Sequence, residues 1–404
     1  MLSVTIIHGD SRGRDRPDRV PTSGTRKGTE GKGDGKSYVN LVAGVSLPMD
    51  AILIPFNPQT ASREAWTAHH RFRRARHEER DPGDPILDDL AYEVLLSSPD
   101  SMTDAYRFTS LAPDGEVTGW LEFEALKEGS PSHAQNPDLA WVWIEVLAPH
   151  RRHGIGAALL EHAADLARRH RRTILGVWTE EADGSGFLKH LDGRFVQSRR
   201  ESRLAIDQVD WDLVRRWAEE GPTRSPGTSL RWFRDGVDDD IVAAFAEVFT
   251  EVFNQQPFGA ATFHGLTFTT ALLREHEART RDAGGTLRTV ISLEPDGRIS
   301  GLTEMTYFPT RPTMISQGLT GVRDRYRGRG LGKWLKAAML LRIRDELPDV
   351  RIVTTGNATS NAAMLSINER LGFRKHKEGW GVELTLDAVE RYLAGRAARR
   401  PEVA

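Results

Sequence analysis

From residue 51 onward, apolar and polar positions follow two periods that alternate along the chain, which predicts strands and helices in turn. The apolar run "AILIPF" at residues 51–56 predicts the first strand. Apolar positions between Trp66 and Ala75 then recur at helical spacing, so an amphipathic helix is expected from Arg63 to about Glu79. We therefore expect the ordered part of the chain to begin near Met49.

A hairpin and a glycine-rich turn follow this helix. The segment "YRFTSLAPDGEVTGWLEFEAL" predicts two strands joined at a Pro-Asp-Gly turn. The strand "LAWVWIEVLA" at residues 139–148 then leads into "HRRHGIG" at 150–156, which opens a helix to about Arg169. The strand "RTILGVWTEE", a short helix near "GFLKHL" and the strand "RFVQSRRESRLAI" close the unit.

The same order returns in the second part of the chain. After "GPTRSPGTS" at residues 221–229, which predicts a linker, strands and helices lead to a second Pro-Asp-Gly turn at Pro295. The strand "ISQGLTGVRD", the turn "YRGRGLG" and a helix follow, and then "VRIVTTGN" and "NAAMLSINERLG". The repeated order predicts two related units. The predicted parts are a leader (1–48), a first domain (49–208), a helix and linker (209–228), a second domain (229–396) and a tail (397–404).

The leader has its own composition. Residues 10–36 hold almost no apolar side chain and many Gly, Arg, Asp and Pro, so this segment is expected to be disordered. A basic arm for nucleic acid is the weaker interpretation, because acids are mixed with the basic residues. A third interpretation is that residues 1–48 are not native protein and that translation starts near Met49.

Composition narrows the function classes. Lys and Arg number 55 against 57 Asp and Glu, a balance that provides no general field for nucleic acid or an anionic membrane. The basic run "RFRRARHEER" is more typical of a solvated helix face than of a DNA-binding patch. The chain contains no Cys, which excludes disulfides, thiolate metal sites and a cysteine nucleophile, and no metal is expected. No apolar run approaches the roughly 20 residues of a membrane span, so a cytoplasmic location is expected.

The two glycine-rich turns carry candidate chemistry. A glycine turn at the start of a helix offers several backbone N–H groups and the positive end of the helix dipole, which suit a phosphate or pyrophosphate. The alternative is that the glycines only ease a tight strand-to-helix turn, and neither turn matches a Walker loop or a Rossmann fingerprint. The candidate residues are Arg151, Arg152, His153, Gly154, Ile155, Gly156 and Ala157 in the first turn, and Arg327, Gly328, Arg329, Gly330, Leu331, Gly332 and Lys333 in the second.

The wider context gives a family resemblance. "VLAPHRRHGIGAALLEHA" and "VRDRYRGRGLGKWLKAA" both resemble the acyl-CoA loop of the GCN5-related N-acetyltransferases (GNAT), V-x-x-x-x-R-x-x-G-x-G-x-x-L, with Val146 and Val322 at the Val position. The closing "NERLGF" resembles a second signature of the family. The double occurrence resembles tandem actinobacterial members, of which mycothiol synthase is one.

The resemblance implies a fold and a mechanism. The fold is α/β (an α+β mixed sheet) with two tandem GNAT-like domains, each a mostly antiparallel twisted sheet with a bulged and splayed central strand flanked by helices. Acetyl-CoA, or another acyl-CoA, is the implied co-substrate, with its pantetheine along Thr320, Gly321 and Val322. An amine acceptor attacks the thioester directly in a ternary complex. Asn357 and Asn361 are the implied further pantetheine contacts, although Asn361 equally suits a helix cap.

The acid and base are less defined. Glu304 in "GLTEMTYF" is the candidate base, and the alternative is that it lies on the solvent face of a strand. Asn368 stands where the family often has a tyrosine proton donor; an amide cannot deliver a proton, but it can hydrogen-bond the sulfur or a water. Tyr307 and His264 are candidates for the acceptor pocket, and "NQQPFGAATFHG" at residues 254–265 is a candidate acceptor loop.

The first domain has a degenerate closing signature, "FLKHLDGRF", and is expected to play a structural or pocket-completing role. The leading hypothesis is an acetyl-CoA-dependent N-acyltransferase acting on a small-molecule amine, as a monomer or homodimer without nucleic-acid or membrane partners. The alternatives are an enzyme acting on protein or peptide amines and a CoA-binding scaffold without catalysis.

Overall fold

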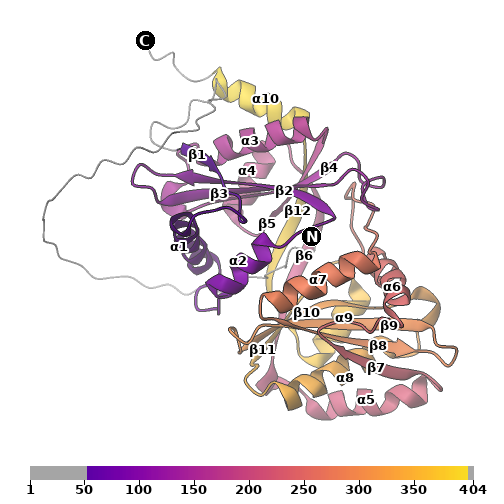
Figure 1. The fold of residues 1–404 in the computed structure, drawn as a ribbon. Coiled ribbons are helices and arrows are strands. Elements are labelled where there is room, and N and C mark those ends of the chain that lie inside the picture. The colour runs from indigo at the N-terminus through magenta and orange to yellow at the C-terminus, as the bar shows by residue number, and fades with distance from the viewer. Residues whose placement is uncertain (1–51, 399–404) are drawn as a thin grey trace, which may run out of the picture.

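The computed structural model describes residues 52–398, and the predicted leader and most of the predicted tail lie outside that range. Within it, twelve strands form one mixed sheet in the order β1-β2-β3-β4-β5-β12-β6-β11-β10-β9-β8-β7 (Figure 1). The strands are β1 (Ile52–Pro55), β2 (Thr103–Leu111), β3 (Val117–Leu126), β4 (Leu139–Val146), β5 (Ile174–Thr179), β6 (Arg194–Ala205), β7 (Ser229–Arg234), β8 (Thr286–Leu293), β9 (Ile299–Tyr307), β10 (Met314–Val322), β11 (Ile352–Ala358) and β12 (Arg374–Thr385).

Ten α-helices accompany this sheet in the described part of the chain. They are α1 (Arg63–Arg80), α2 (Asp89–Ser97), α3 (Ile155–Arg169), α4 (Ala182–His190), α5 (Trp211–Arg224), α6 (Val242–Asn254), α7 (Thr270–Asp282), α8 (Leu331–Glu346), α9 (Ala362–Leu371) and α10 (Leu386–Ala397). The element order follows the two repeats that the sequence predicts. In these residues no helix is both long enough and apolar enough to cross a bilayer.

The two repeats, with β1 to β6 in the first half of the chain and β7 to β12 in the second half, exchange their last strands. β12, at the end of the second repeat, pairs antiparallel with β5 of the first, and β6, at the end of the first repeat, pairs with β11 of the second. β6 and β12 also pair with each other, so the sheet is continuous across the molecule (Figure 1). Val382 and Val389 accordingly belong to the same apolar core as Leu159 of α3. The separate sheets implied by the resemblance are thus joined into one.

The first four residues of the predicted linker, 221–224, are helical. α5 continues through Gly221 and Pro222 to Arg224, so only residues 225–228 connect it to β7. α5 packs along α8, and a Cβ on Gly221 would lie 2.2 Å from the Trp334 ring. Glycine is therefore required where the helix meets that indole, and the backbone groups of the segment find helical partners instead of solvent.

The sheet register divides the side chains into two faces. α3 and α8 cover one face: Leu121 and Val142 pack against α3, and Met305 and Ile315 pack in the core that α8 completes. The other face is partly covered, by α1 over β3 and by α6 and α7 over β8, β9 and β10. Between these covers lies a cavity of about 2020 Å³ that is lined by residues of both halves.

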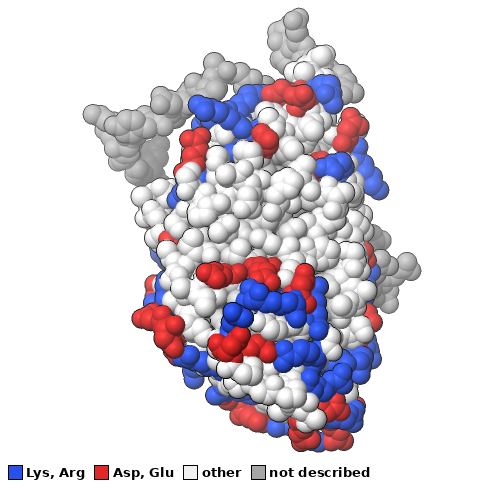
Figure 2. All heavy atoms as spheres, turned by 90° about the vertical axis from the view of Figure 1, so that its right-hand side faces the viewer, with Lys and Arg blue, Asp and Glu red and all other residues white. Residues whose placement is uncertain are grey.

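The surface carries both signs of charge. On the face seen in Figure 2, Lys and Arg atoms are interspersed with Asp and Glu atoms, and a broad central area carries neither. This face therefore has no extended basic patch of the kind that nucleic-acid binding needs.

Candidate active site

Strand β10 separates from β11 in the second half. The two strands pair in parallel from Met314↔Ile352 as far as Gln317↔Thr355, and the pairing stops there although both strands continue. On its other side, β10 has a bulge between Gln317 and Thr320, opposite Glu304 of β9. A bulge re-aims a strand and leaves backbone groups available. The opening between β10 and β11 can therefore accept an extended chain that bonds to main-chain groups.

The second glycine turn lies at the wide end of this opening. Gly328 and Gly330 have φ values of 81° and 83°, a region that favours glycine, and Gly330 is the residue before α8. Arg327 donates from Nε to the Val322 carbonyl at 3.2 Å, which ties the turn to the end of β10. The turn lies outside the residues that line the large cavity.

Basic side chains gather around this helix start. Burial, with the nearby charges of Arg370 and Arg224, lowers the pKa of Lys333. Arg224 Nε also lies 2.9 Å from the position that a Cβ on Gly330 would take. Three cations from α5, α8 and α9 therefore stand beside the first free N–H groups of α8, an arrangement suited to a multiply charged phosphate ligand.

Glu304 lies on the partly covered face, across from the β10 bulge. Its side chain is 6% exposed and lines the cavity. Burial raises the pKa of Glu304 to about 8, and the Thr289 hydroxyl, which donates to its carboxylate at 3.3 Å, opposes that rise. A carboxyl with a pKa close to the working pH is suited to general base catalysis. The solvent-face alternative for Glu304 is excluded, because the residue is buried.

A polar network lies on the other face of the same strands. Lys336 of α8 donates from Nζ to Gln317 Oε1, and Gln317 donates from Nε2 to the Thr303 hydroxyl at 3.3 Å. The hydroxyls of Thr303 and Thr320 are 2.7 Å apart. Burial lowers the pKa of Lys336 to about 7. The network therefore lies beside the bulge of β10, on the face of the sheet that α8 covers.

The three asparagines have different places. Asn357 and Asn361 line the cavity, and Asn361 also caps α9 by accepting from the Met364 N–H at 3.2 Å. Asn368 is fully buried, does not line the cavity, and donates to Asn357 Oδ1 at 2.8 Å. Asn368 therefore orients Asn357, and this geometry gives it no direct path to a ligand in the cavity.

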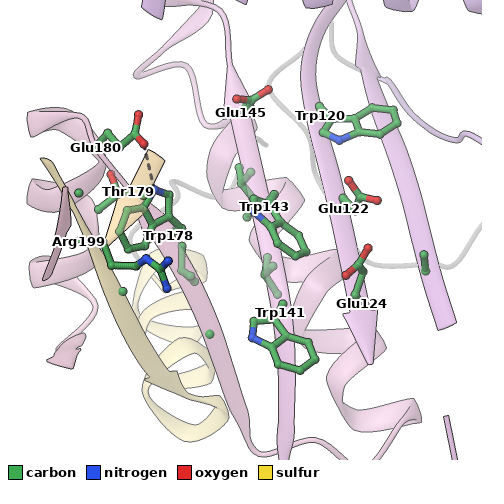
Figure 3. A pocket seen from close by; sticks show the side chains of 18 of the residues that line it. Trp120, Glu122, Glu124, Trp141, Trp143, Glu145, Trp178, Thr179, Glu180 and Arg199 are labelled. Atoms are coloured by element: carbon green, nitrogen blue, oxygen red, sulfur yellow. Dashed lines mark hydrogen bonds between the residues drawn. The ribbon is translucent and has the colours of Figure 1, made fainter. Parts of the chain in front are cut away.

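The first half contains the counterpart of this site, with different side chains. β4 also separates from β5 after Val142↔Val177, but its register against β3 has no bulge. On the cavity side, Trp and Glu alternate across the two strands (Figure 3). The cross-strand pairs are Trp120↔Glu145, Glu122↔Trp143 and Glu124↔Trp141.

Glu122 corresponds to Glu304 in register. Gly119 pairs with Val146, and Gly301 pairs in the same way with Val322, so the two glycines occupy equivalent positions. Glu122 and Glu304 each lie three residues after these glycines and are therefore equivalent as well. Arg107 lies across from Glu122 and forms an ion pair with it at 2.6 Å. At the equivalent place across from Glu304, β8 has Thr289.

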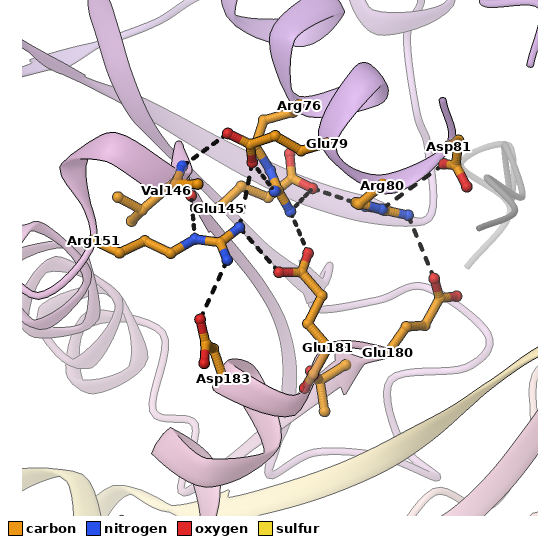
Figure 4. Close-up of polar contacts among 12 residues, drawn as sticks. Arg76, Glu79, Arg80, Asp81, Glu145, Val146, Arg151, Glu180, Glu181 and Asp183 are labelled. Atoms are coloured by element: carbon orange, nitrogen blue, oxygen red, sulfur yellow. Dashed lines mark hydrogen bonds and ion pairs between the residues drawn. The ribbon is translucent and has the colours of Figure 1, made fainter. Parts of the chain in front are cut away.

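An ionic cluster surrounds Arg151 at the start of the first glycine turn (Figure 4). Arg151 lies 3.0 Å from Glu181, 3.3 Å from Glu79 and 3.4 Å from Asp183, while Glu79 accepts from the Ala148 N–H at 2.8 Å. A second set of contacts extends it across the gap between β4 and β5. That set joins Arg76 to Glu79, Glu145 and Glu181, and Arg80 to Glu145 and Glu180.

The remaining predicted residues divide into two groups. Thr320, Val146, Arg151, Arg152, Gly154, Gly156 and Ala157 line the cavity, whereas Gly321, Val322, His153 and Ile155 do not. The predicted acceptor loop contributes Gln256, Phe258, Ala261 and Phe263 to the lining. Tyr307 and His264 lie outside it.

The residues predicted from the sequence do not include Lys336, Glu122 or most of the ionic cluster. A signal for Lys336 was present, because it is a single charge on the buried side of "WLKAAMLLRI", where the neighbouring Leu335 and Met339 are core residues. The cluster gave no such signal, since Glu79, Glu181 and Arg151 come from elements far apart in sequence.

Part of the first half matches a known protein family. Residues 66–186 match the model of the Acetyltransferase (GNAT) family. The mycothiol acetyltransferase of Salinispora arenicola (strain CNS-205) is 28% identical over 289 residues, which is 70% of this chain and 82% of that protein. The mycothiol acetyltransferase of Salinispora tropica is 27% identical over a similar length, with the same coverage.

Solved structures match across both halves. A tandem GNAT protein from the clavulanic acid biosynthesis pathway superposes with a TM-score of 0.67 at 22% identity, covering 83% of this chain and 99% of that one. A GCN5-related N-acetyltransferase from Sphaerobacter thermophilus has a TM-score of 0.58 at 16% identity, covering 84% and 97%. At these identities the matches establish the tandem fold.

Proposed function

Because the chain contains a GNAT acetyltransferase domain and has a tandem GNAT fold, we propose that this N-acetyltransferase takes the acyl group from acetyl-CoA or another acyl-CoA. The acceptor is an amine of a small molecule, and the second half carries the chemistry. The family model matches the first half, so the assignment to the second half depends on the site itself.

The difference between Glu304 and Glu122 carries this proposal. A general base must reach the acceptor proton as a carboxylate that is not committed to a cation, with a pKa near the working pH. Glu304 has a hydroxyl as its neighbour and burial sets its pKa at about 8. Burial raises the pKa of Glu122 too, and the Arg107 guanidinium opposes that rise; Arg107 also holds the carboxylate, so a proton transferred to Glu122 breaks an ion pair.

The geometry of β10 supports the same assignment. Pantetheine enters between β10 and β11 as an added strand, and its pyrophosphate lies at the start of α8 beside Arg224, Lys333 and Arg370. A main-chain N–H of the bulge stabilises the oxyanion while Glu304 takes the amine proton. Asn357, oriented by Asn368, contacts the pantetheine arm from β11.

The first half is the second candidate, because its glycine turn lines the cavity and its residues match the family model. The ionic cluster argues against it. Glu79, Glu181 and Asp183 already surround Arg151, so an entering pyrophosphate would meet three carboxylates and would have to displace them. β4 also lacks the bulge that opens main-chain groups in β10.

The acceptor is expected to enter the cavity that both halves line. The space of about 2020 Å³ is larger than a usual ligand pocket, and both halves line it. The relatives named mycothiol acetyltransferase point to a small-molecule acceptor in place of a protein amine. Residues of the 254–265 loop line the same cavity as Glu304, and Trp178 and Arg199 line its first-half part (Figure 3).

The test is release of free thiol from acetyl-CoA with a panel of amines, combined with a matched pair of variants. Gly332 and Gly156 occupy the same place in the two turns, both have ordinary φ, and a Cβ on either meets nothing closer than 3.5 Å. Gly332→Asp puts a carboxylate at the start of α8 and is expected to weaken acetyl-CoA binding by at least tenfold. Gly156→Asp in α3 is expected to leave it unchanged.

The opposite pattern would assign the working site to the first half. Tight CoA binding by the wild-type protein without thiol release for any amine would favour a non-catalytic scaffold. Transfer to peptide amines alone would favour the protein-modifying alternative. Both variants keep their fold on electrostatic grounds, since a carboxylate in the first turn of a helix is favourable.

A further inference from the structure

Lys336 is a buried cation without a counter-charge. Its side chain is 1% exposed, and no carboxylate among the described residues forms an ion pair with it. Its contacts are the Gln317 side-chain oxygen and the face of the Phe373 ring, 5.4 Å from Nζ to the centroid. Burying an ammonium group in this way is costly.

The position of Lys336 matches the end of the opening between β10 and β11. Gln317, its hydrogen-bond partner, is the last residue of β10 that pairs with β11, and the bulge begins directly after it. Lys336, Gln317 and Thr320 all line the cavity. Lys336 therefore belongs to the wall of the cavity at the place where β10 and β11 separate.

The first half provides an internal control for this network. Counting from the first residue of α3 and α8, Lys336 corresponds to Leu160, and the sheet registers equate Gln317 with Val142, Thr303 with Leu121 and Thr320 with Ile144. Leu160, Val142 and Leu121 are buried in one apolar core, and Ile144 packs against it. Four apolar side chains thus fill the space that four polar ones fill in the second half.

This comparison removes a structural reason for the lysine. The same fold is completed by Leu160 in the first half, so an apolar residue satisfies the packing between α3 and its sheet. A buried polar network that the fold does not need is retained for another purpose. Its position beside the bulge, where the thioester is placed under the proposed function, indicates which purpose.

We infer that Lys336 is the general acid that protonates the departing thiolate of CoA. The inference rests on the proposed function and names the proton donor for it. The acceptor nitrogen forms a bond to the thioester carbonyl carbon, and Glu304 takes the nitrogen's proton. When the carbon–sulfur bond breaks, its electron pair stays on sulfur and the Lys336 ammonium donates a proton to it. The products are the amide and CoA thiol, with Lys336 neutral and Glu304 protonated until solvent restores both.

The neighbouring groups favour this direction of proton transfer. Burial alone sets the pKa of Lys336 at about 7, which makes the ammonium a stronger acid than an ordinary thiol. Lys336 contacts Gln317 of β10 and the Phe373 ring, Gln317 in turn contacts Thr303 of β9, and none of these three side chains titrates. Glu304 projects from the opposite face of β9, so the base and the acid stand on either side of the bulged strand.

The test is the pH dependence of kcat/KM for acetyl transfer by the full chain. The wild-type enzyme needs Glu304 ionised and Lys336 protonated, so we expect a bell-shaped profile with its maximum between about 7 and about 8. Lys336→Leu, which copies Leu160, and Lys336→Met are expected to lower kcat by roughly 10²–10⁴-fold and to lose the alkaline decline. Both variants are expected to melt at least as high as the wild type.

Each outcome has one meaning. If the wild type transfers acetyl groups and either variant keeps both its rate and the alkaline decline, the inference is wrong and the proposed function stands. If the wild type releases no thiol with any amine, the proposed function itself fails. A variant that melts well below the wild type would show that the lysine is structural, and this also overturns the inference.

Discussion

Arg107 faces Glu122 across β2 and β3 at the register position where Thr289 faces Glu304 across β8 and β9. One substitution between duplicated strands therefore separates a carboxylate held in an ion pair from one that is buried beside a hydroxyl. The two halves share a backbone plan, and their chemistry differs through single side chains at equivalent places.

Glu304→Gln keeps the size of the side chain and removes its ability to accept the amine proton. We expect kcat/KM for amine acetylation to fall by roughly 10²–10⁴-fold at pH 8, the contribution typical of a general base. Glu122→Gln is the matched control, and it is expected to retain activity within a few-fold. Equal losses in both variants, measured by thiol release, would contradict the assignment of the base.

Thr289→Val removes the hydroxyl that donates to Glu304 without changing the shape of the side chain. Because this donor favours the ionised carboxylate, its loss is expected to raise the pKa of Glu304 further above about 8. The acidic limb of the kcat/KM profile then moves to higher pH, and the maximum of the bell moves the same way and becomes lower, because less of the enzyme has Glu304 ionised while Lys336 is still protonated. A limb that stays in place or moves to lower pH would mean that another group controls it.

Glu304 and Lys336, the proposed base and acid, are expected to have opposite effects on how the free energy of unfolding depends on pH. Burial raises the pKa of Glu304 from 4.5 to about 8, so the folded protein holds a proton that the unfolded chain has lost, and stability falls as pH rises through this window. Burial lowers the pKa of Lys336 from 10.5 to about 7, so stability rises between about pH 7 and 10.

Melting temperatures from pH 5 to 10 test this. The melting temperature of Glu304→Gln is expected to change less with pH between 5 and 8 than that of the wild type. The melting temperature of Lys336→Leu is expected to change less with pH above 7. Curves that run parallel to the wild type over the whole range would show that neither group has a shifted pKa in the folded protein.

Gly221→Ala tests the contact between α5 and α8. A Cβ at this position would lie 2.2 Å from the Trp334 ring, so the helices must move apart. We expect a loss of about 1–3 kcal/mol in the free energy of unfolding, measured by denaturant titration. Gly186→Ala in α4 is the control, since nothing lies within 4 Å of its added methyl group, and this change is expected to stabilise the protein slightly. A Gly221→Ala variant with the same free energy of unfolding as the wild type would mean that α5 and α8 are loosely packed at this contact.

Much of the fold could be predicted from local patterns. The helix at residues 63–80, the paired hairpins and the two glycine turns follow from periodicity and turn residues that act within a few positions of each other. The local sequence also gave a signal for the burial of Glu304, because this acid lies in an otherwise apolar strand. Asn361 could be predicted as a helix cap from its place before an apolar run.

The exchange of β6 and β12 could not be predicted in this way. The local pattern of each strand does not specify which repeat provides its neighbours, and the choice depends on which core Val382 and Leu384 enter. The ionic cluster is a similar case, because the side chains around Arg151 come from α1, the end of β5 and α4. Such arrangements depend on tertiary geometry, which the order of residues along one element does not encode.

The strand exchange has a consequence for synthesis on the ribosome. β5 is complete at Thr179, but its neighbour β12 is made only at residues 374–385, close to the end of the described chain. The open edge of the first half therefore waits through the translation of about half the protein, and an unpaired edge is a site for wrong association. Nascent chains stalled before residue 374 lack β12 between β5 and β6, so the core of the first half is completed last, whereas both strands of the β6–β11 pair are already made.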